Sequence, residues 1–341
     1  MRIATSFLCA ALLLATAAAA EPPALAAEVD ASGQRIVVSS RHEGNWEIYS
    51  ANAAGTEAVN LTNTPDADEG CPRVSFDGRH LAFVKLGRKR SYEQDRGQVF
   101  LFDLVTGERT KIEPLDRADA LAWSPDSKEL AASWGAGERK SKGVRIYNLG
   151  TKEVRAIAPT AGGISDIDWS GCGKYFAFGA RDSFGLHWQI MVMNADGTGI
   201  RRLAHARKGG FCHPAWSRAN EIAVNCLVEG LIVARFDVED PKYTIDTRKK
   251  SKDWRTLLDL AVNPHNSNPR WSPCGKYILW SMPPGKRPTR TNINSRRLYV
   301  VRAADGAWAP VGPKDFLTAT VDYDWFPAPK KEEKKEAEKN E

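Results

Sequence analysis

The chain has 341 residues, a formal net charge of +6 and 42% hydrophobic residues. This length suffices for one large all-β domain, because closed β architectures often exceed the usual domain size of ~150 residues. The basic excess is too modest to favour nucleic acid as a partner, and acidic components of a cell envelope match it better.

The chain begins with the pattern of a secretory signal peptide over residues 1–20. A short positive start precedes an apolar run over Phe7–Ala15, and Ala18–Ala20 supplies the small residues that a signal peptidase reads. That run is too short for a transmembrane helix, which needs ~20 apolar residues, and no later segment predicts a membrane span. A second alanine-rich cut site lies at Ala26–Ala27. We therefore expect an exported protein, periplasmic or secreted, whose mature chain starts at Glu21.

A repeated unit follows. Five segments read as an apolar strand ending in Trp or Phe, then a Ser, a tight turn and a second strand, and the unit recurs about every fifty residues. A third strand and a weaker fourth strand complete each unit. Four antiparallel strands joined by short turns predict one blade of a propeller. The shared serines are Ser75, Ser124, Ser170, Ser217 and Ser272.

The two ends of the repeat region complete each other. Residues 35–39 and 46–50 read as a second and a third strand that lack a first strand, and residues 320–326 read as a spare first strand. Joining them closes the ring and removes exposed sheet edges. The sequence therefore predicts an all-β, six-bladed β-propeller of four-stranded antiparallel blades over residues 33–328, in which the C-terminal strand joins the N-terminal blade.

Two segments fall outside this ring. Residues 21–32 are expected to be a linker between the signal peptide and the propeller. Residues 329–341 consist almost entirely of Lys and Glu. Because such a segment cannot bury apolar surface, we expect a disordered charged tail.

The repeats resemble the WD40-like (PD40) repeat of the TolB-like propellers, and the likeness recurs across residues 35–326. TolB itself carries an α/β domain before its propeller, whereas only the expected linker precedes the first strand in this sequence. The resemblance therefore implies a TolB-like propeller without the segment that TolB uses toward its inner-membrane partner. The stretches that carry it most clearly are Ser39–Tyr49, Asn52–Gly55, Asn60–Thr62 and Pro72–Gly78.

Three loops between second and third strands are strongly basic and share one rim of the predicted ring. Clustered Lys and Arg at a concave mouth attract anions, so this rim is a candidate binding surface for an envelope protein or an anionic glycan. The alternative is that these loops are simply solvated. The candidate residues are Arg88, Lys89, Arg90, Arg139, Lys140, Lys142, Lys286, Arg287 and Arg290.

The same rim collects possible ligands of a divalent metal, namely His213, His265 and Asp68. The TolB-like resemblance adds to this hypothesis, because that group includes oligogalacturonate lyases with a His-bound metal. The alternative is that these residues are ordinary polar loop residues. The sequence holds no Gly-x-Ser-x-Gly elbow, phosphate loop or dinucleotide fingerprint, and no other cofactor is predicted.

Two cysteines are predicted to form a disulfide. The hairpin of the fifth unit turns around Ala219, which places Cys212 opposite Cys226 at a distance that a disulfide can span. The alternative is two buried thiols. One aromatic residue per unit is predicted to pack between blades. These residues are Trp123, Trp169, Trp216, Trp271 and Trp325.

These patterns favour an exported, monomeric binding scaffold for a protein or glycan of the cell envelope. A metal-assisted polysaccharide lyase or hydrolase that uses the channel mouth is the alternative. A purely structural envelope subunit is a third possibility.

Overall fold

The structure is a computed structural model in which most of the predicted strands are described. The described residues are 24–41, 44–87, 97–134, 143–157, 164–181, 188–205, 210–226, 230–237, 240, 243–246, 252–258, 268–282, 297–312 and 322–327.

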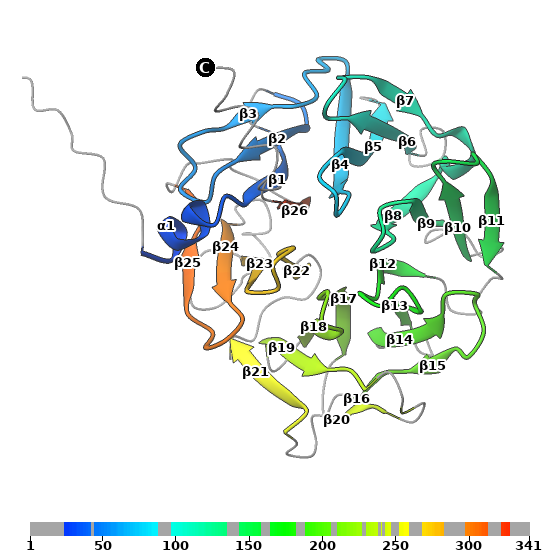
Figure 1. Cartoon of the computed structure of the whole chain (residues 1–341), viewed down its shortest axis with the longest axis vertical. Helices are drawn as coiled ribbons and strands as arrows, with labels where there is room; N and C mark the ends of the chain where they lie inside the picture. Colours follow the sequence, from blue (N-terminus) through cyan, green and yellow to red (C-terminus); the bar gives the residue numbers. More distant parts are fainter. Residues whose placement is uncertain are drawn as a thin grey trace, which may run out of the picture.

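The described residues form six four-stranded antiparallel sheets around a central axis (Figure 1). Each sheet is one blade, and the strands of a blade are given from the axis outward. Blade 1 contains β26 (Asp322–Phe326), β1 (Arg35–Ser40), β2 (Glu47–Ala51) and β3 (Val59–Asn60). Blade 2 contains β4 (Ala67–Val74), β5 (His80–Gly87), β6 (Gln98–Asp103) and β7 (Arg109–Lys111). Blade 3 contains β8 (Ala118–Trp123), β9 (Glu129–Trp134), β10 (Gly143–Asn148) and β11 (Val154–Ile157).

The second half of the ring repeats this arrangement. Blade 4 contains β12 (Ser165–Trp169), β13 (Tyr175–Arg181), β14 (Trp188–Asn194) and β15 (Arg201–Arg202). Blade 5 contains β17 (Phe211–Trp216), β18 (Glu221–Cys226), β19 (Gly230–Arg235) and β21 (Trp254–Leu258). Blade 6 contains β22 (Arg270–Trp271), β23 (Tyr277–Met282), β24 (Arg297–Arg302) and β25 (Trp308–Pro310). Outside the blades, the described chain contains a short parallel pair, β16 (Ala204–His205) with β20 (Ile245–Asp246), and a 3-10 turn, η1 (Glu113–Leu115), besides one helix.

The ring is closed by the two ends of the repeat region, as predicted. Strand β26 pairs antiparallel with β1, and Ile36 lies opposite Trp325 in the register. The Trp325 side chain is only 2% exposed and belongs to a hydrophobic cluster that joins blades 1 and 6. The blade count and the mode of closure are therefore confirmed.

The aromatic residue that recurs in the inner strands packs between blades. The side chains of all five predicted tryptophans are buried. Trp169 and Trp216, for example, belong to two different clusters that each combine residues of neighbouring blades. A single blade cannot bury both of its faces, so the ring is stable only because each blade covers the next one.

The serine that recurs after the inner strand has a local role in the turn. The Ser75 hydroxyl donates to Asp77 Oδ1 (2.5 Å) and accepts from the backbone N–H of His80 (2.9 Å). Ser124 makes the same pair of bonds with Asp126 and Glu129. A hydroxyl that bonds in both directions fixes the tight turn, which explains why this Ser recurs.

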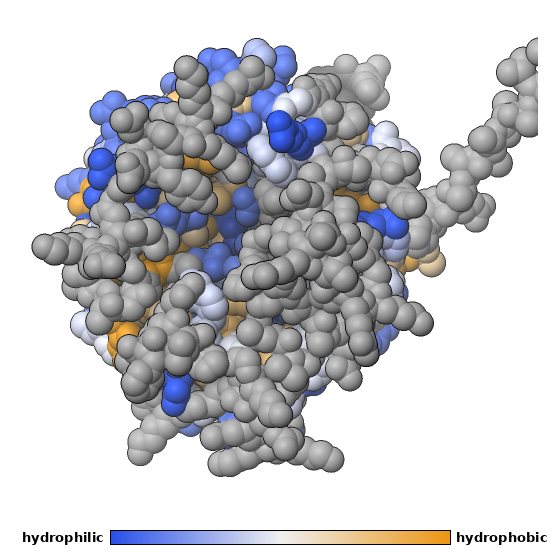
Figure 2. All heavy atoms as spheres, turned by 180° about the vertical axis from the view of Figure 1, so that it is seen from behind, coloured by the Kyte–Doolittle hydropathy of each residue, from blue (hydrophilic) through white to orange (hydrophobic). Residues whose placement is uncertain are grey.

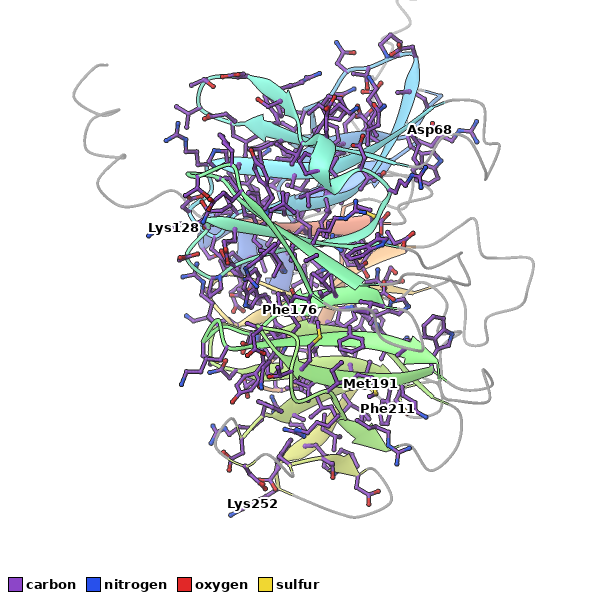
Figure 3. The ribbon with its side chains drawn as sticks, turned by 90° about the vertical axis from the view of Figure 1, so that its right-hand side faces the viewer. Asp68, Lys128, Phe176, Met191, Phe211 and Lys252 are labelled. Atoms are coloured by element: carbon purple, nitrogen blue, oxygen red, sulfur yellow. The ribbon has the colours of Figure 1, made fainter. Side chains whose placement is uncertain are left out.

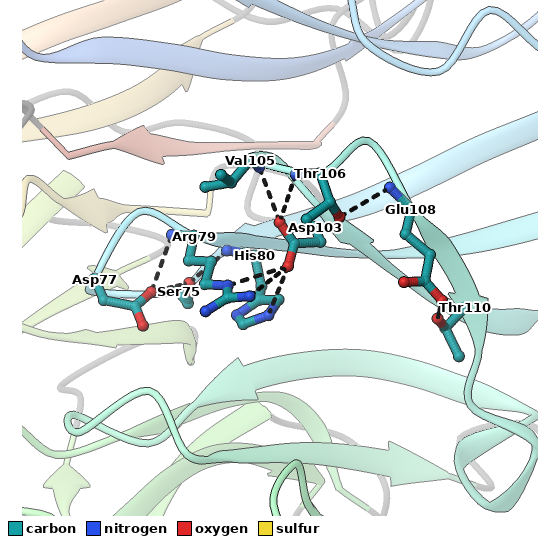
Figure 4. A network of polar contacts seen from close by, with 9 residues as sticks. All are labelled: Ser75, Asp77, Arg79, His80, Asp103, Val105, Thr106, Glu108 and Thr110. Carbon is teal, nitrogen blue, oxygen red and sulfur yellow. Dashed lines mark hydrogen bonds and ion pairs between the residues drawn. The ribbon is translucent and has the colours of Figure 1, made fainter.

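Blade 2 extends this turn into a wider polar network (Figure 4). Asp103 accepts hydrogen bonds from the backbone N–H groups of Val105 (2.9 Å) and Thr106 (3.0 Å) and from the Arg79 guanidinium. The bond from Thr106, followed by those from Val105 and Arg79, lowers the pKa of Asp103 to about 2. The network joins the β4–β5 turn to the β6–β7 turn at the outer part of the blade.

Residues 24–31 form a helix, α1 (Ala24–Ala31), where a plain linker was expected. Leu25, Ala26 and Val29 are buried against blade 6, because they recur on one side of the helix. Glu28 accepts hydrogen bonds from the Tyr277 hydroxyl and from Arg302 (both 2.7 Å). Of the helices that the structure describes, none combines the length and hydropathy of a membrane span.

The predicted Cys212–Cys226 disulfide is wrong, and a β-bulge explains why. Close to the turn the register is the predicted one, since Trp216 lies opposite Ile222. A bulge between Cys212 and Ala215 shifts the register by one residue, so Cys212 lies opposite Asn225 and Phe211 opposite Cys226. Successive side chains of a strand point to opposite faces, so the two cysteines lie on different faces of the sheet. Both are buried thiols in the structure.

Candidate functional site on the ring axis

The six inner strands place one equivalent position each around the axis, directly before the residue that packs between blades. Four of these six residues are charged and two are alanine. Two arginines and two aspartates therefore share one layer of the ring. In ring order from blade 1 the residues are Asp324, Arg73, Ala122, Asp168, Ala215 and Arg270.

A cavity of about 50 Å³ lies at this layer, lined by all four charged side chains and by Trp123, Trp216, Trp271 and Trp325. Its lining continues to Phe76 and Pro273, which belong to the turns after the inner strands. These turns lie at the face that carries Lys128, opposite the face that carries Asp68 (Figure 3). On the Asp68 face, hydrophilic residues gather in a hollow at the centre of the ring (Figure 2).

Arg73 connects three inner strands through hydrogen bonds. Its Nε donates to the Leu121 carbonyl on β8 (3.2 Å), and its Nη1 donates to the carbonyls of Pro72 (2.6 Å) and Tyr323 (3.4 Å), the latter on β26. The residue is only 6% exposed. Because carbonyl oxygens satisfy the buried guanidinium, Arg73 stabilises the ring itself.

Arg270 has the same burial, 6% exposed, but not the same partners. Its Nε is buried without a hydrogen-bond partner, and within the described ranges its guanidinium donates no hydrogen bond at all. Burial and the nearby charge of Arg73 lower the pKa of Arg270, while Asp168 and Asp324 oppose that shift. An arginine remains charged under these conditions, so a cationic donor group lines the cavity with its hydrogen-bonding capacity unused.

The two aspartates of the layer are held by the next blade. Asp168 Oδ2 accepts from the backbone N–H of Trp216 (2.6 Å), and Asp324 Oδ2 accepts from that of Val74 (2.9 Å). Burial raises the pKa of both carboxyl groups, while Arg270 and Arg73 act in the opposite direction. Each aspartate therefore joins two blades through a hydrogen bond to the peptide backbone.

The indole N–H groups of the same layer fall into two classes. Trp123 Nε1 donates to the Arg73 carbonyl (2.9 Å), and Trp325 Nε1 donates to the Arg270 carbonyl (2.8 Å). The indole N–H groups of Trp216 and Trp271 are buried and have no partner in the described structure. Together with Arg270 Nε, they make three unused buried donors on residues that line one cavity.

A second layer lies two residues earlier in the inner strands. His213 Nδ1 lies 2.8 Å from Asp166 Oδ2 of the preceding blade. Burial alone would lower the pKa of His213, but the Asp166 carboxylate and the neighbouring Cys212 together outweigh burial and hold this pKa well above its usual value. The equivalent residues of blades 2 and 1 are Cys71 and Asp322, and the backbone N–H of Cys71 donates to Asp322 Oδ2 (3.3 Å). The second layer thus contains two corresponding pairs of residues. One is the ion pair of Asp166 with His213, and the other is Asp322 with Cys71, which carries a thiol.

The backbone of this second layer is unusual in a repeated way. Cys71, Asp166 and His213 have positive φ angles of 52°, 49° and 55°, and each lies at a bulge of its inner strand. Left-handed conformations are rare for residues other than glycine, and bulges re-aim the side chains that follow them. The bulges therefore set which residues face the axis in blades 2, 4 and 5.

The structure does not bring the predicted metal ligands together. Asp68 is on β4 of blade 2 and accepts a hydrogen bond from the backbone N–H of Trp46 (3.0 Å), whereas His213 is on β17 of blade 5, across the ring (Figure 1). His265 lies outside the described residues. The described residues contain no group of three or more His, Cys, Asp or Glu placed to hold a metal. The metal site stays a prediction.

The predicted basic rim also lies outside the described residues, so it stays a prediction as well. Its members are Arg88, Lys89, Arg90, Arg139, Lys140, Lys142, Lys286, Arg287 and Arg290. The axial residues, by contrast, were missed from the sequence, although a pattern was present. A charged residue directly before the aromatic residue of a buried inner strand breaks the apolar pattern of such a strand, and burying a charge requires a partner.

Comparisons with known proteins support the propeller. No family model matches the chain. A dipeptidyl-peptidase 5 from Porphyromonas gingivalis is 31% identical over 108 residues, which cover 29% of this chain and 16% of that protein. A TolB homologue from Chlorobaculum tepidum is 27% identical over 101 residues, which cover 30% of this chain and 22% of that protein. The chain thus matches less than a quarter of the length of either relative.

Solved structures extend the likeness to nearly the whole chain. TolB from Acinetobacter baumannii superposes with a TM-score of 0.64 and 16% identity, covering 86% of this chain and 66% of that one. A chain in the crystal structure of a nidogen/laminin complex superposes with a TM-score of 0.61 and 11% identity, covering 87% of this chain and 99% of that one. At these identities the likeness establishes the fold, and the resemblance to TolB that the repeats predicted is confirmed at that level.

Proposed function

Because the chain is a six-bladed propeller that resembles TolB, we propose that it is a non-catalytic binding scaffold of the cell envelope that holds an acidic protein partner at its axis. One observation carries this proposal. The axial cavity is lined by the buried, cationic Arg270, whose donors are unused, next to two more unused donors. A concave site with a few convergent polar groups is the first candidate for a ligand-binding site in a protein of unknown function.

The relatives support binding more than catalysis. The structural neighbours include TolB and a chain from a nidogen/laminin complex, which is an assembly of two proteins. The match to the dipeptidyl peptidase spans only 16% of that protein, so we do not extend its peptidase activity to this chain.

Helix α1 supports the first of the two candidate cut sites for export. Leu25 and Ala26 are buried in the cluster between blades 1 and 6. A cut at Ala26–Ala27 would remove both residues from this cluster, whereas a cut after Ala20 leaves the whole helix in place. We therefore propose that the exported chain starts at Glu21, and the intact mass of the protein purified from the periplasm or the medium tests this start.

Capture of a partner tests the binding function. The mature chain, tagged at its C-terminus, is incubated with envelope extract at low and at high salt. We expect an acidic protein to be captured at low salt and released at high salt, because ionic screening weakens charge attraction. Capture that is unchanged by salt would contradict the proposal. Capture that survives protease treatment of the extract would identify an anionic glycan in place of a protein.

The metal-assisted polysaccharide enzyme remains the alternative function. Elemental analysis of the purified protein separates it from the scaffold. Stoichiometric divalent metal that is lost in His213→Ala would favour the enzyme. Metal far below one equivalent would favour the scaffold.

A further inference from the structure

We propose that the axial cavity binds a single carboxylate group, held by the Arg270 guanidinium and by the indole N–H groups of Trp216 and Trp271. The proposal deepens the proposed binding function, since it names the chemical group through which a partner would be anchored. The carboxylate can belong to a free small anion or to a protein side chain or C-terminus.

Several buried hydrogen-bond donors without a partner belong to residues at the axial cavity. Native proteins leave few buried polar groups without a partner, because each such group loses its hydrogen bonds to water. Here three of them belong to residues that line one cavity: Arg270 Nε and the indole Nε1 atoms of Trp216 and Trp271. They come from the inner strands of two neighbouring blades, β17 and β22.

The chemistry of the unused groups indicates which kind of ligand the cavity would bind. Indole and guanidinium groups donate hydrogen bonds and cannot accept them. Asp168 and Asp324 of the same layer each accept a hydrogen bond from a backbone N–H group of the next blade. The buried groups of the lining residues that lack a partner are all donors, which suits an acceptor with negative charge.

The shape of the guanidinium and the size of the cavity limit the ligand further. A guanidinium is planar and binds a planar carboxylate through two parallel hydrogen bonds. The cavity of about 50 Å³ is several times the ~10–15 Å³ that one water requires. That is room for a carboxylate head group and too little for a sugar ring. A glycan would thus enter only through an acidic substituent.

Blades 1, 2 and 3 provide the internal comparison. Their arginine, Arg73, directs its donors to three carbonyl groups. The indole N–H groups of Trp123 and Trp325 are likewise paired with carbonyl groups. Since all these tryptophans line the same cavity, the unused donors are confined to the side formed by blades 5 and 6.

The test uses the mature chain and sodium acetate, with sodium chloride at the same ionic strength as the reference. We expect acetate to raise the melting temperature in a saturable way and to change the tryptophan fluorescence. Arg270→Met should weaken acetate binding about ten-fold or more, because it removes a charged hydrogen bond. Trp271→Phe should weaken acetate binding to a smaller extent.

Trp169→Phe is the matched control, because it removes an indole N–H that the Gly173 carbonyl already accepts and Trp169 does not line the cavity. It should leave acetate binding unchanged once the protein is folded. If Arg270→Met fails to fold, Trp216→Phe and Trp271→Phe together replace it, since each removes one unused donor. Equal effects of acetate and chloride, or acetate binding by Arg270→Met as tight as by the wild type, would overturn the proposal and leave the cavity to water.

The source of the carboxylate is resolved with peptides. Short peptides that end in a free carboxylate, their C-terminal amides, and amides with one internal Glu compete with acetate in the fluorescence assay. Competition by the first class alone indicates a C-terminus, and competition by the third indicates a side chain. Acetate binding without capture of any envelope partner would contradict the proposed scaffold function but not the carboxylate site. Capture of a partner without acetate binding would contradict the carboxylate site but not the scaffold function.

Discussion

Arg73 and Arg270 occupy the same place in two blades and have the same burial, yet they are used differently. Arg73 donates to carbonyl groups of its own strand and of the inner strands on either side. Arg270 donates no hydrogen bond within the described residues, and its Nε is buried without a partner. In a repeat protein, one position can therefore stabilise the ring in one blade and remain available for a ligand in another.

The strands that carry the two arginines also differ. Strand β4, which carries Arg73, spans Ala67–Val74 and pairs with β5 over most of its length. Strand β22, which carries Arg270, contains two residues and pairs with β23 through two residue pairs. Two of the three acceptors of Arg73 lie on the neighbouring inner strands β8 and β26, so the use of the guanidinium depends on the blades on either side.

The largest expected effect comes from Arg73. Arg73→Met leaves three carbonyl groups without their donor and removes a positive charge near Asp324. We expect a loss of about 3–5 kcal/mol in the free energy of unfolding, measured by urea denaturation, as for breaking other buried charged contacts. The matched variant Arg270→Met breaks no hydrogen bond but removes the positive charge beside Asp168, so we expect a smaller loss than in Arg73→Met. Equal losses in the two variants would mean that Arg270 stabilises the ring as Arg73 does, and would contradict its assignment to a ligand site.

Much of this fold could be predicted from the sequence. The recurring Ser, the tryptophans and the turn residues act locally or through burial, and both effects leave a period that can be read along the chain. Ring closure followed because residues 320–326 match the strand that the first blade lacks. These features agree with the structure because local preference and overall topology point the same way.

The axial site and the pairing register of the cysteines could not be predicted from the sequence. The bulge at His213 shifts the pairing by one residue, and no turn signature in the sequence marks it. The unused state of Arg270 depends on which carbonyl groups reach it from other strands, so it is a property of the tertiary structure. Equivalence with Arg73 in the repeat would have suggested the opposite.

The second layer extends the comparison to pH. Blades 4 and 5 hold Asp166 with His213, where blades 1 and 2 hold Asp322 with Cys71. Because Asp166 raises the pKa of His213 above its unfolded value of ~6.5, its stabilisation is complete below pH ~6.5 and is lost as pH rises through the folded pKa. His213→Gln should therefore lose about 1.5–3 kcal/mol at pH 6 and progressively less at higher pH.

Denaturation curves of the wild type and His213→Gln from pH 6 to 9 measure this convergence. Cys71→Ser is the matched variant. Burial raises the pKa of Cys71, so this residue stays an uncharged thiol over the same range. Its effect on stability should not depend on pH. A His213→Gln curve that runs parallel to the wild type would show that the ion pair carries no proton-linked stability.

A smaller effect separates the two classes of indole. Trp325→Phe leaves the buried Arg270 carbonyl without its donor, which is expected to lower the free energy of unfolding by about 1 kcal/mol beyond the change in packing. Trp271→Phe removes an N–H that has no partner in the described structure, so only the packing change remains. Urea denaturation without carboxylate anions measures both variants. A larger loss in Trp271→Phe would mean that its N–H is already satisfied.

The smallest effect comes from the periphery and tests whether the axis behaves as a separate unit. Asp103, in the network of Figure 4, has a pKa lowered to about 2 chiefly by the N–H of Thr106. Because this pKa is depressed, the network contributes stability above pH ~4, which is lost as pH falls through 2. The network lies near the surface and is screened by solvent, so Asp103→Asn should lower stability at pH 7 by no more than about 1 kcal/mol. Distant sites that share no partners have additive effects, so the loss should be equal in the wild-type and Arg270→Met backgrounds. A loss that differs between the backgrounds by more than about 0.5 kcal/mol would mean that the axial donors are coupled to the blade periphery, and Arg270 would then belong to the supporting framework as Arg73 does.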